Sequence, residues 1–112
     1  MRDEELIGLC RELIRRPSVS GEERAVAEFL GDTMASLGYP QVEIDRYGSV
    51  LGWIPGCRPG KTVLMDGHID TVPVEDPGLW THDPFAGEVE GERLYGRGAS
   101  DMKGGVAAMV LA

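Results

Sequence analysis

The feature that most constrains this chain is a short apolar run that ends in polar side chains. Residues 62–65 (Thr-Val-Leu-Met) have the character of a buried strand, and Asp66-Gly67 ends the run with a turn-prone pair. His68 and Asp70 follow directly. Residues two apart in extended backbone point to the same side, so a strand here would present an imidazole and a carboxylate together. Because ligands bind at the carboxyl edge of α/β sheets, the pattern predicts an α/β fold with a site at this edge.

This pair of side chains is suited to metal chemistry. A neutral histidine nitrogen is a good zinc ligand, and a nearby carboxylate can orient the ring or bind the ion itself. A His-x-Asp triplet also occurs in loops that hydrogen bonds alone hold in place. The interpretation as a metal site therefore depends on position: a strand before the pair, a glycine at the turn, and a second acidic, glycine-rich loop downstream.

Composition excludes several classes of partner. The 112 residues are enough for one modest domain, and their formal net charge of −8 disfavours nucleic acid and anionic membranes. No apolar run is long enough to span a membrane, and the acidic N-terminus does not resemble a secretory signal. Cys10 and Cys57 lack a metal-binding spacing and are expected to be free thiols in a reducing, cytoplasmic compartment.

The remaining pattern predicts an α/β arrangement of helices and hairpins. An amphipathic helix over residues 4–16 is closed by Pro17, and a second helix is expected to begin with a capping box of Ser20 and Glu23 and to end at Gly38. Further segments are expected as a strand containing Val42 and Ile44, a strand over 50–54, an irregular loop over 73–85, a hairpin over 88–95 that turns near Gly91, and a buried helix over 106–112.

A second candidate ligand, Asp101, lies in a glycine-rich loop between the predicted hairpin and the last helix. The loop is not a dinucleotide-binding fingerprint, because Asp101 stands at the third glycine position, and it lacks the GK[ST] of a phosphate-binding loop. An acid on a tight loop beside the edge with His68 is therefore a candidate metal ligand. Arg97 and Lys103 are expected to anchor this loop or face solvent rather than to meet an anionic substrate.

Three blocks together resemble a known enzyme family. GHIDTVP at 67–73, WTHDPFAG at 80–87 and LYGRGASDMKGG at 94–105 are similar to the dinuclear zinc family of acetylornithine deacetylase, succinyl-diaminopimelate desuccinylase, aminoacylase and glutamate carboxypeptidase. The resemblance implies a three-layer α/β/α catalytic domain with a mixed central sheet, of which residues 1–112 would be the N-terminal portion. Ser49, where the family usually has Asn, is a minor departure in a turn.

The resemblance also implies roles for three residues. His68 would ligate one metal, Asp70 would be the catalytic residue that orients His68, and Asp101 would bridge two metals, with a cis peptide after it. Two zinc ions per full-length chain are implied, with cobalt or manganese as alternatives. The implied reaction is hydrolysis of an amide bond in N-acyl amino acids or small peptides by a metal-activated water, in a full-length homodimer.

Several parts of the family's machinery are not found in these residues. The adjacent Glu-Glu pair that supplies the general base, another acidic ligand, a final histidine ligand and the dimerisation domain would all follow Ala112. We therefore expect an N-terminal fragment of a hydrolase, inactive by itself.

Two alternatives stay open from the sequence. One is a non-catalytic binding or structural domain that keeps the fold. The other is a mononuclear hydrolase that uses His68, Asp70 and His82.

Overall fold

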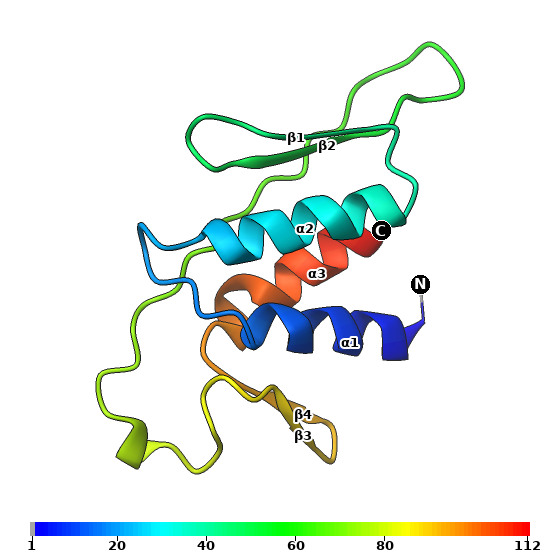
Figure 1. Ribbon diagram of the computed structural model, residues 1–112. Coiled ribbons are helices and arrows are strands. Elements are labelled where there is room, and N and C mark those ends of the chain that lie inside the picture. Colours follow the sequence, from blue (N-terminus) through cyan, green and yellow to red (C-terminus); the bar gives the residue numbers. More distant parts are fainter. Residues whose placement is uncertain (1) are drawn as a thin grey trace.

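The computed structural model describes residues 2–112 and shows a small α/β arrangement of three helices and two hairpins. The helices are α1 (Asp3–Ile14), α2 (Arg24–Ser36) and α3 (Gly104–Leu111). Helix α3 packs against α1, and Figure 1 shows it between α1 and α2. One hairpin lies beyond α2 and the other beyond α1, so the helices form the middle of the molecule (Figure 1).

Helix α1 confirms the first predicted helix, with its end two residues earlier. Three acidic residues occupy its first turn, where the helix dipole favours negative charge. The Glu5 carboxylate accepts a hydrogen bond from the backbone N–H of Arg2, at 3.2 Å, which satisfies one group at the helix start. The helix ends at Ile14, ahead of Pro17, because proline has no N–H to bond to the Leu13 carbonyl and disfavours helical backbone at the residue before it.

Helix α2 confirms the second predicted helix but not its expected start. Glu23 is the N-cap residue and makes no capping hydrogen bond through its side chain, so the predicted capping box of Ser20 and Glu23 is wrong. The Ser20 hydroxyl donates instead to the Asp70 carboxylate, 50 residues away. The C-terminus is as expected, since Gly38 has a φ of +88° and Tyr39 N–H bonds back to the Met34 carbonyl.

Both hairpins are antiparallel and close to their predicted positions. Strands β1 (Gln41–Ile44) and β2 (Val50–Trp53) pair with Val42 opposite Gly52. Strands β3 (Glu88–Glu90) and β4 (Arg93–Tyr95) pair around Gly91, which has a φ of +60°. The loop before β3 contains only the short 3₁₀ turn η1 (Pro77–Leu79).

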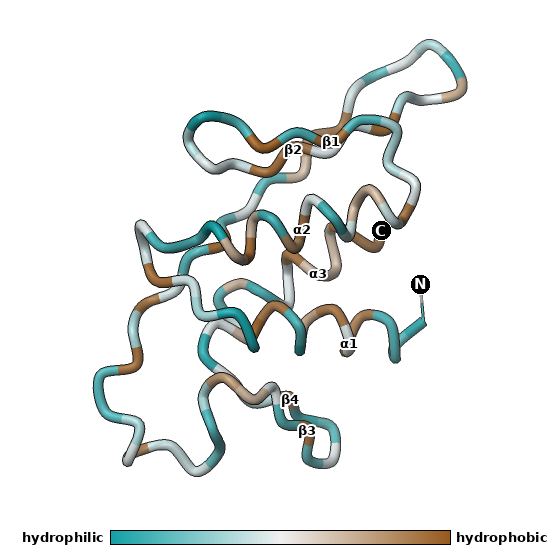
Figure 2. Tube along the Cα trace, viewed as in Figure 1, coloured by the Kyte–Doolittle hydropathy of each residue, from teal (hydrophilic) through white to brown (hydrophobic). Residues whose placement is uncertain are grey.

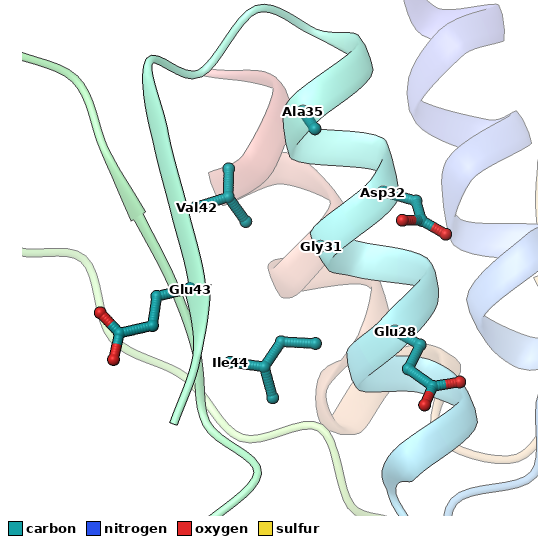
Figure 3. Close-up of a pocket in the computed structure, with 7 residues that line it drawn as sticks. All are labelled: Glu28, Gly31, Asp32, Ala35, Val42, Glu43 and Ile44. Carbon is teal, nitrogen blue, oxygen red and sulfur yellow. The ribbon is translucent and has the colours of Figure 1, made fainter. Parts of the chain in front are cut away.

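A shallow hollow of about 490 Å³ marks the seam between α2 and β1. Figure 3 shows Val42 and Ile44 pointing from the strand toward the helix, whereas Glu43 points away. Gly31 lies opposite this strand, and a Cβ at this position would be 3.5 Å from the Ile44 side chain, an ordinary packing distance. Imidazole and thiol groups are absent from its lining, and we interpret the hollow as packing between hairpin and helix.

The core joins the three helices. Leu13 and Ile14 on α1 and Ala107 on α3 have no exposed surface, and Val26 and Leu30 on α2 are 1–2% exposed. These apolar positions recur at helical spacing. Their burial is the main favourable contribution of the helical layer to the free energy of folding. The full set of buried core residues is Leu9, Cys10, Leu13, Ile14, Val26, Leu30, Val106, Ala107 and Val110.

The predicted buried strand over residues 62–65 is not formed. Val63, Leu64 and Met65 are 84%, 86% and 56% exposed, and the segment pairs with no other strand in the described part of the chain. An isolated parallel bridge nearby joins Val19 to Thr71. An extended segment becomes a strand only when a neighbour takes up its backbone hydrogen bonds, and residues 2–112 supply none for it. The expected mixed sheet is likewise replaced by the two separate hairpins.

Hydrophobic residues occur both in the packed helices and in the open chain outside them. Figure 2 shows hydrophobic residues on the three helices and also along the open chain between β2 and β3. None of the helices within residues 2–112 has the length and apolar character needed to cross a membrane.

Candidate metal site

Two separate segments bring the predicted site residues together. The chain after residue 67 and the loop before α3 meet around a hollow of about 270 Å³. His68 and Asp70 come from the first segment and Asp101 from the second. The lining residues are Ser20, His68, Asp70, Thr71, Val72, Gly96, Arg97, Gly98, Ala99, Ser100 and Asp101.

The His68 imidazole lies between two aspartates. Its Nε2 is 2.8 Å from Oδ1 of Asp101, and its Nδ1 is 3.0 Å from the carbonyl oxygen of Asp70 and 3.1 Å from the Asp70 carboxylate. The hydrogen bond to Asp101 and then the one to Asp70 raise the pKa of His68, since both favour the imidazolium. Asp70 thus holds one ring nitrogen and leaves the other directed at Asp101.

Asp70 has a partner that the sequence did not reveal. The Ser20 hydroxyl donates a hydrogen bond to its carboxylate, and this bond lowers the pKa of Asp70 because it stabilises the ionised form. The two residues are far apart in sequence, and Ser20 matched a local capping pattern. Sequence reasoning therefore assigned Ser20 to the helix and missed its place at the site.

Asp101 sits in a tight loop, the segment η2 (Ala99–Lys103) that leads into α3. The Asp101-Met102 peptide is cis, as the family resemblance predicted. Gly98, with a φ of +80°, allows this loop to approach the other segment, because a Cβ here would lie 2.5 Å from Cγ2 of Thr71. The close contact between the two segments therefore requires glycine at this position.

The two basic residues of the loop have different surroundings. Lys103 is 2% exposed, and its ammonium donates to the carbonyls of Leu13 and Arg16, each at 2.8 Å. Burial lowers the pKa of Lys103 to about 8. The expectation that Lys103 anchors the loop is confirmed. The Arg97 guanidinium stacks over the Trp80 ring, 4.9 Å from its centre, and its buried Nε has no hydrogen-bond partner among residues 2–112.

His82 belongs to a different part of the molecule. Its Nδ1 lies 2.7 Å from the Glu88 carboxylate and its Nε2 lies 3.3 Å from Glu90, while its ring stacks on Tyr95. It does not line the hollow that contains His68. This placement gives no support to a mononuclear site built from His68, Asp70 and His82.

The donors at the hollow fit a zinc-type ion but do not complete its shell. An imidazole nitrogen and a carboxylate oxygen are preferred zinc donors, and bonds of roughly 2 Å let two donors 2.8 Å apart share one ion. Within residues 2–112, no group of three His, Cys, Asp or Glu side chains is placed so that it could hold a metal ion.

The second half of the chain is similar in sequence to a known protein family. The sequence profile of peptidase family M20/M25/M40 matches residues 64–112, which include His68, Asp70 and Asp101. This is the segment that contains both parts of the candidate site.

Individual relatives match nearly the whole chain. Succinyl-diaminopimelate desuccinylases from Methylobacterium sp. (strain 4-46) and Cereibacter sphaeroides are each 40% identical to it over 95% of its length. In both cases the chain covers 28% of the relative. An M20 family metallo-carboxypeptidase from Sulfolobus solfataricus superimposes with a TM-score of 0.82 and 31% identity, over 98% of this chain and 26% of that structure. The chain thus spans about a quarter of the proteins it resembles.

Proposed function

The chain belongs to peptidase family M20/M25/M40, and we propose that it forms part of a metal-dependent hydrolase that cleaves an amide bond in an N-acyl amino acid or a small peptide. The observation that carries this proposal is the convergence of His68 Nε2 and Asp101 Oδ1, 2.8 Å apart, from two segments of the chain. The relatives named as desuccinylases and a metallo-carboxypeptidase support a substrate of this class.

The donor chemistry supports zinc, with cobalt or manganese as alternatives, because imidazole and carboxylate sets accept all three ions. His68 and Asp101 would hold the metal, and Asp70 would support His68. A pair of such ions in the complete protein would lower the pKa of a bound water and polarise the substrate carbonyl.

Asp70 prepares His68 for this role through the Nδ1 side of the ring. A proton held at Nδ1 by Asp70 leaves the Nε2 lone pair for an ion, since a neutral imidazole carries one N–H and one acceptor nitrogen. A cation at Nε2 requires the neutral imidazole, because only a deprotonated ring nitrogen offers a lone pair.

The finer architecture is part of the same proposal. Val63, Leu64 and Met65 are apolar and more than half exposed, as expected for a strand whose neighbours lie elsewhere in a longer protein. We propose that this segment joins a mixed sheet between two helical layers in that protein. We also propose that the remaining metal ligands and the general base lie outside residues 2–112. The longer protein would be a cytoplasmic homodimer, with its dimer contacts outside these residues as well.

Metal content and hydrolysis test the proposal on the product of the longest reading frame that contains this chain. We expect about two zinc ions per purified chain by mass spectrometry, and cleavage of N-succinyl or N-acetyl amino acids. His68→Ala and Asp101→Ala should each lower the activity by a factor of at least about 100. Each should also lower the metal content, because it removes a metal ligand.

His82→Ala is the matched control, because it removes an imidazole that is held by the β3–β4 hairpin and not by the hollow. Its metal content should equal that of the unmodified protein. Full activity in both ligand variants, or a long form without bound metal, would refute the proposed function.

A further inference from the structure

One short segment contacts both halves of the candidate site. We call it the α1–α2 connection and define it as residues 13–20, the last two residues of α1 and the six that follow the helix. We propose that Ser20 and Lys103 are positioning residues that use this connection to hold His68 and Asp101 in register for a divalent cation. The inference rests on the proposed metal-dependent function and assigns a role to residues that the donor set does not include.

The half of the site that carries His68 is attached to the connection by three hydrogen bonds. The Ser18 hydroxyl donates to the Ile69 carbonyl at 2.8 Å, and the Thr71 N–H donates to the Ser18 carbonyl, also at 2.8 Å. Ser18 has no exposed surface, so these bonds are shielded from water. The third bond runs from the Ser20 hydroxyl to Asp70, which itself contacts the His68 ring.

The half that carries Asp101 is attached through Lys103. Its ammonium bonds to the carbonyls of Leu13 and Arg16, and its backbone N–H bonds to the Gly98 carbonyl at 2.8 Å. The last carbonyls of a helix lack helical partners and carry partial negative charge, so a buried ammonium is favoured there. Lys103 therefore connects both ends of the Asp101 loop to the end of α1.

The ligands themselves have little packing to hold them. The side chains of His68 and Asp101 are 48% and 87% exposed. A side chain at such an exposed site keeps its direction only if its backbone and its hydrogen-bond partners are fixed. The arrangement of the two ligands thus depends on the connection behind them, and this is the physical basis for the proposed roles of Ser20 and Lys103.

The test measures metal binding by the product of the longest reading frame that contains this chain. Zn²⁺ affinity is obtained by competition with a chromogenic chelator, and the visible absorption of the Co²⁺ form reports ligand geometry. Ser20→Ala should weaken Zn²⁺ binding about 10-fold and alter the Co²⁺ spectrum, as outer-shell substitutions do. Ser20→Thr, which keeps the hydroxyl, should restore both.

Ser36→Ala is the matched control, because within residues 2–112 the Ser36 hydroxyl bonds to the Thr33 carbonyl at the end of α2 and to no group of the candidate site. Zn²⁺ affinity and the Co²⁺ spectrum should be unchanged in this variant. Lys103→Met should weaken Zn²⁺ binding by about 10–100-fold. If that variant fails to fold, the Ser20 series still decides the question, because Ser20 is exposed and contributes nothing to the core.

The outcomes separate this inference from the proposed function. Unmodified protein that binds Zn²⁺, together with Ser20→Ala of unchanged affinity and spectrum, overturns the inference alone. Unmodified protein that binds neither ion overturns the proposed function and the inference with it. Weaker binding in Ser20→Ala with recovery in Ser20→Thr supports the positioning role, because a purely structural hydroxyl would not move the Co²⁺ spectrum.

Discussion

The buried face of the helical layer and the open segment at residues 63–65 both carry large apolar side chains but have opposite surroundings. Leu13 and Ile14 on α1 have no exposed surface, whereas Val63 and Leu64 are more than four-fifths exposed. The helices satisfy their backbone hydrogen bonds internally and need only an apolar face to pack on. The open segment needs neighbouring strands as well. The difference teaches that an apolar sequence makes burial possible. Burial occurs only where the rest of the chain provides a surface to pack on and, for a strand, groups that accept and donate its backbone hydrogen bonds.

The strongest test of this contrast compares two leucines. Leu13→Ala should lower the free energy of unfolding of this 112-residue chain by about 2–5 kcal/mol, because it opens a cavity in the core. Leu64→Ala should change it by less than about 0.5 kcal/mol, because this side chain is 86% exposed. Urea unfolding followed by circular dichroism measures both. Equal losses would show that the open segment is buried in solution.

A second test concerns the contact that brings the two site segments together. Gly98→Ala should lower the free energy of unfolding by about 2–3 kcal/mol. The φ of +80° is strained for alanine, and its Cβ would lie 2.5 Å from the Thr71 side chain. Gly91→Ala is the control, because it has a φ of +60° and open space around it, and should cost about 1 kcal/mol. Thermal unfolding compares them. Equal costs would mean that Gly98 serves only its backbone conformation.

The smallest predicted effect is the pH dependence of an ion-pair cluster on α1. Hydrogen bonds from Arg16 and then Arg15 lower the pKa of Glu12 below its usual 4.5. A depressed carboxyl pKa stabilises the folded state above 4.5, and this contribution is lost as the pH falls through the lower, folded-state pKa. Because these side chains are partly exposed to solvent, Glu12→Gln should lower the free energy of unfolding by only about 0.5 kcal/mol near neutral pH, and should not change it in strong acid.

The control for this prediction is Glu92→Gln in the turn between β3 and β4, where the described residues show no ion pair with Glu92. Urea unfolding across the acid range compares the two variants. A loss for Glu12→Gln that persists in strong acid would assign the effect to packing rather than to charge.

Local patterns predicted helix and hairpin positions well and the site only in part. The spacing of His68 and Asp70, and the single acid Asp101 in a glycine-rich loop, were readable because each depends on neighbouring residues. The partners of these groups were not readable. Ser20 matched a capping box, yet its hydroxyl bonds to Asp70, and only the fold brings the two residues together.

The sequence by itself determined which segments are helical, where glycines turn the chain, and which side chains offer metal-binding chemistry. These properties follow from periodicity and residue type over fewer than about 15 positions. Tertiary structure alone decided that Lys103 is buried against Leu13, 90 residues away, and that residues 63–65 remain exposed. Such outcomes depend on which distant groups offer hydrogen bonds and apolar surface, and local sequence does not encode that choice.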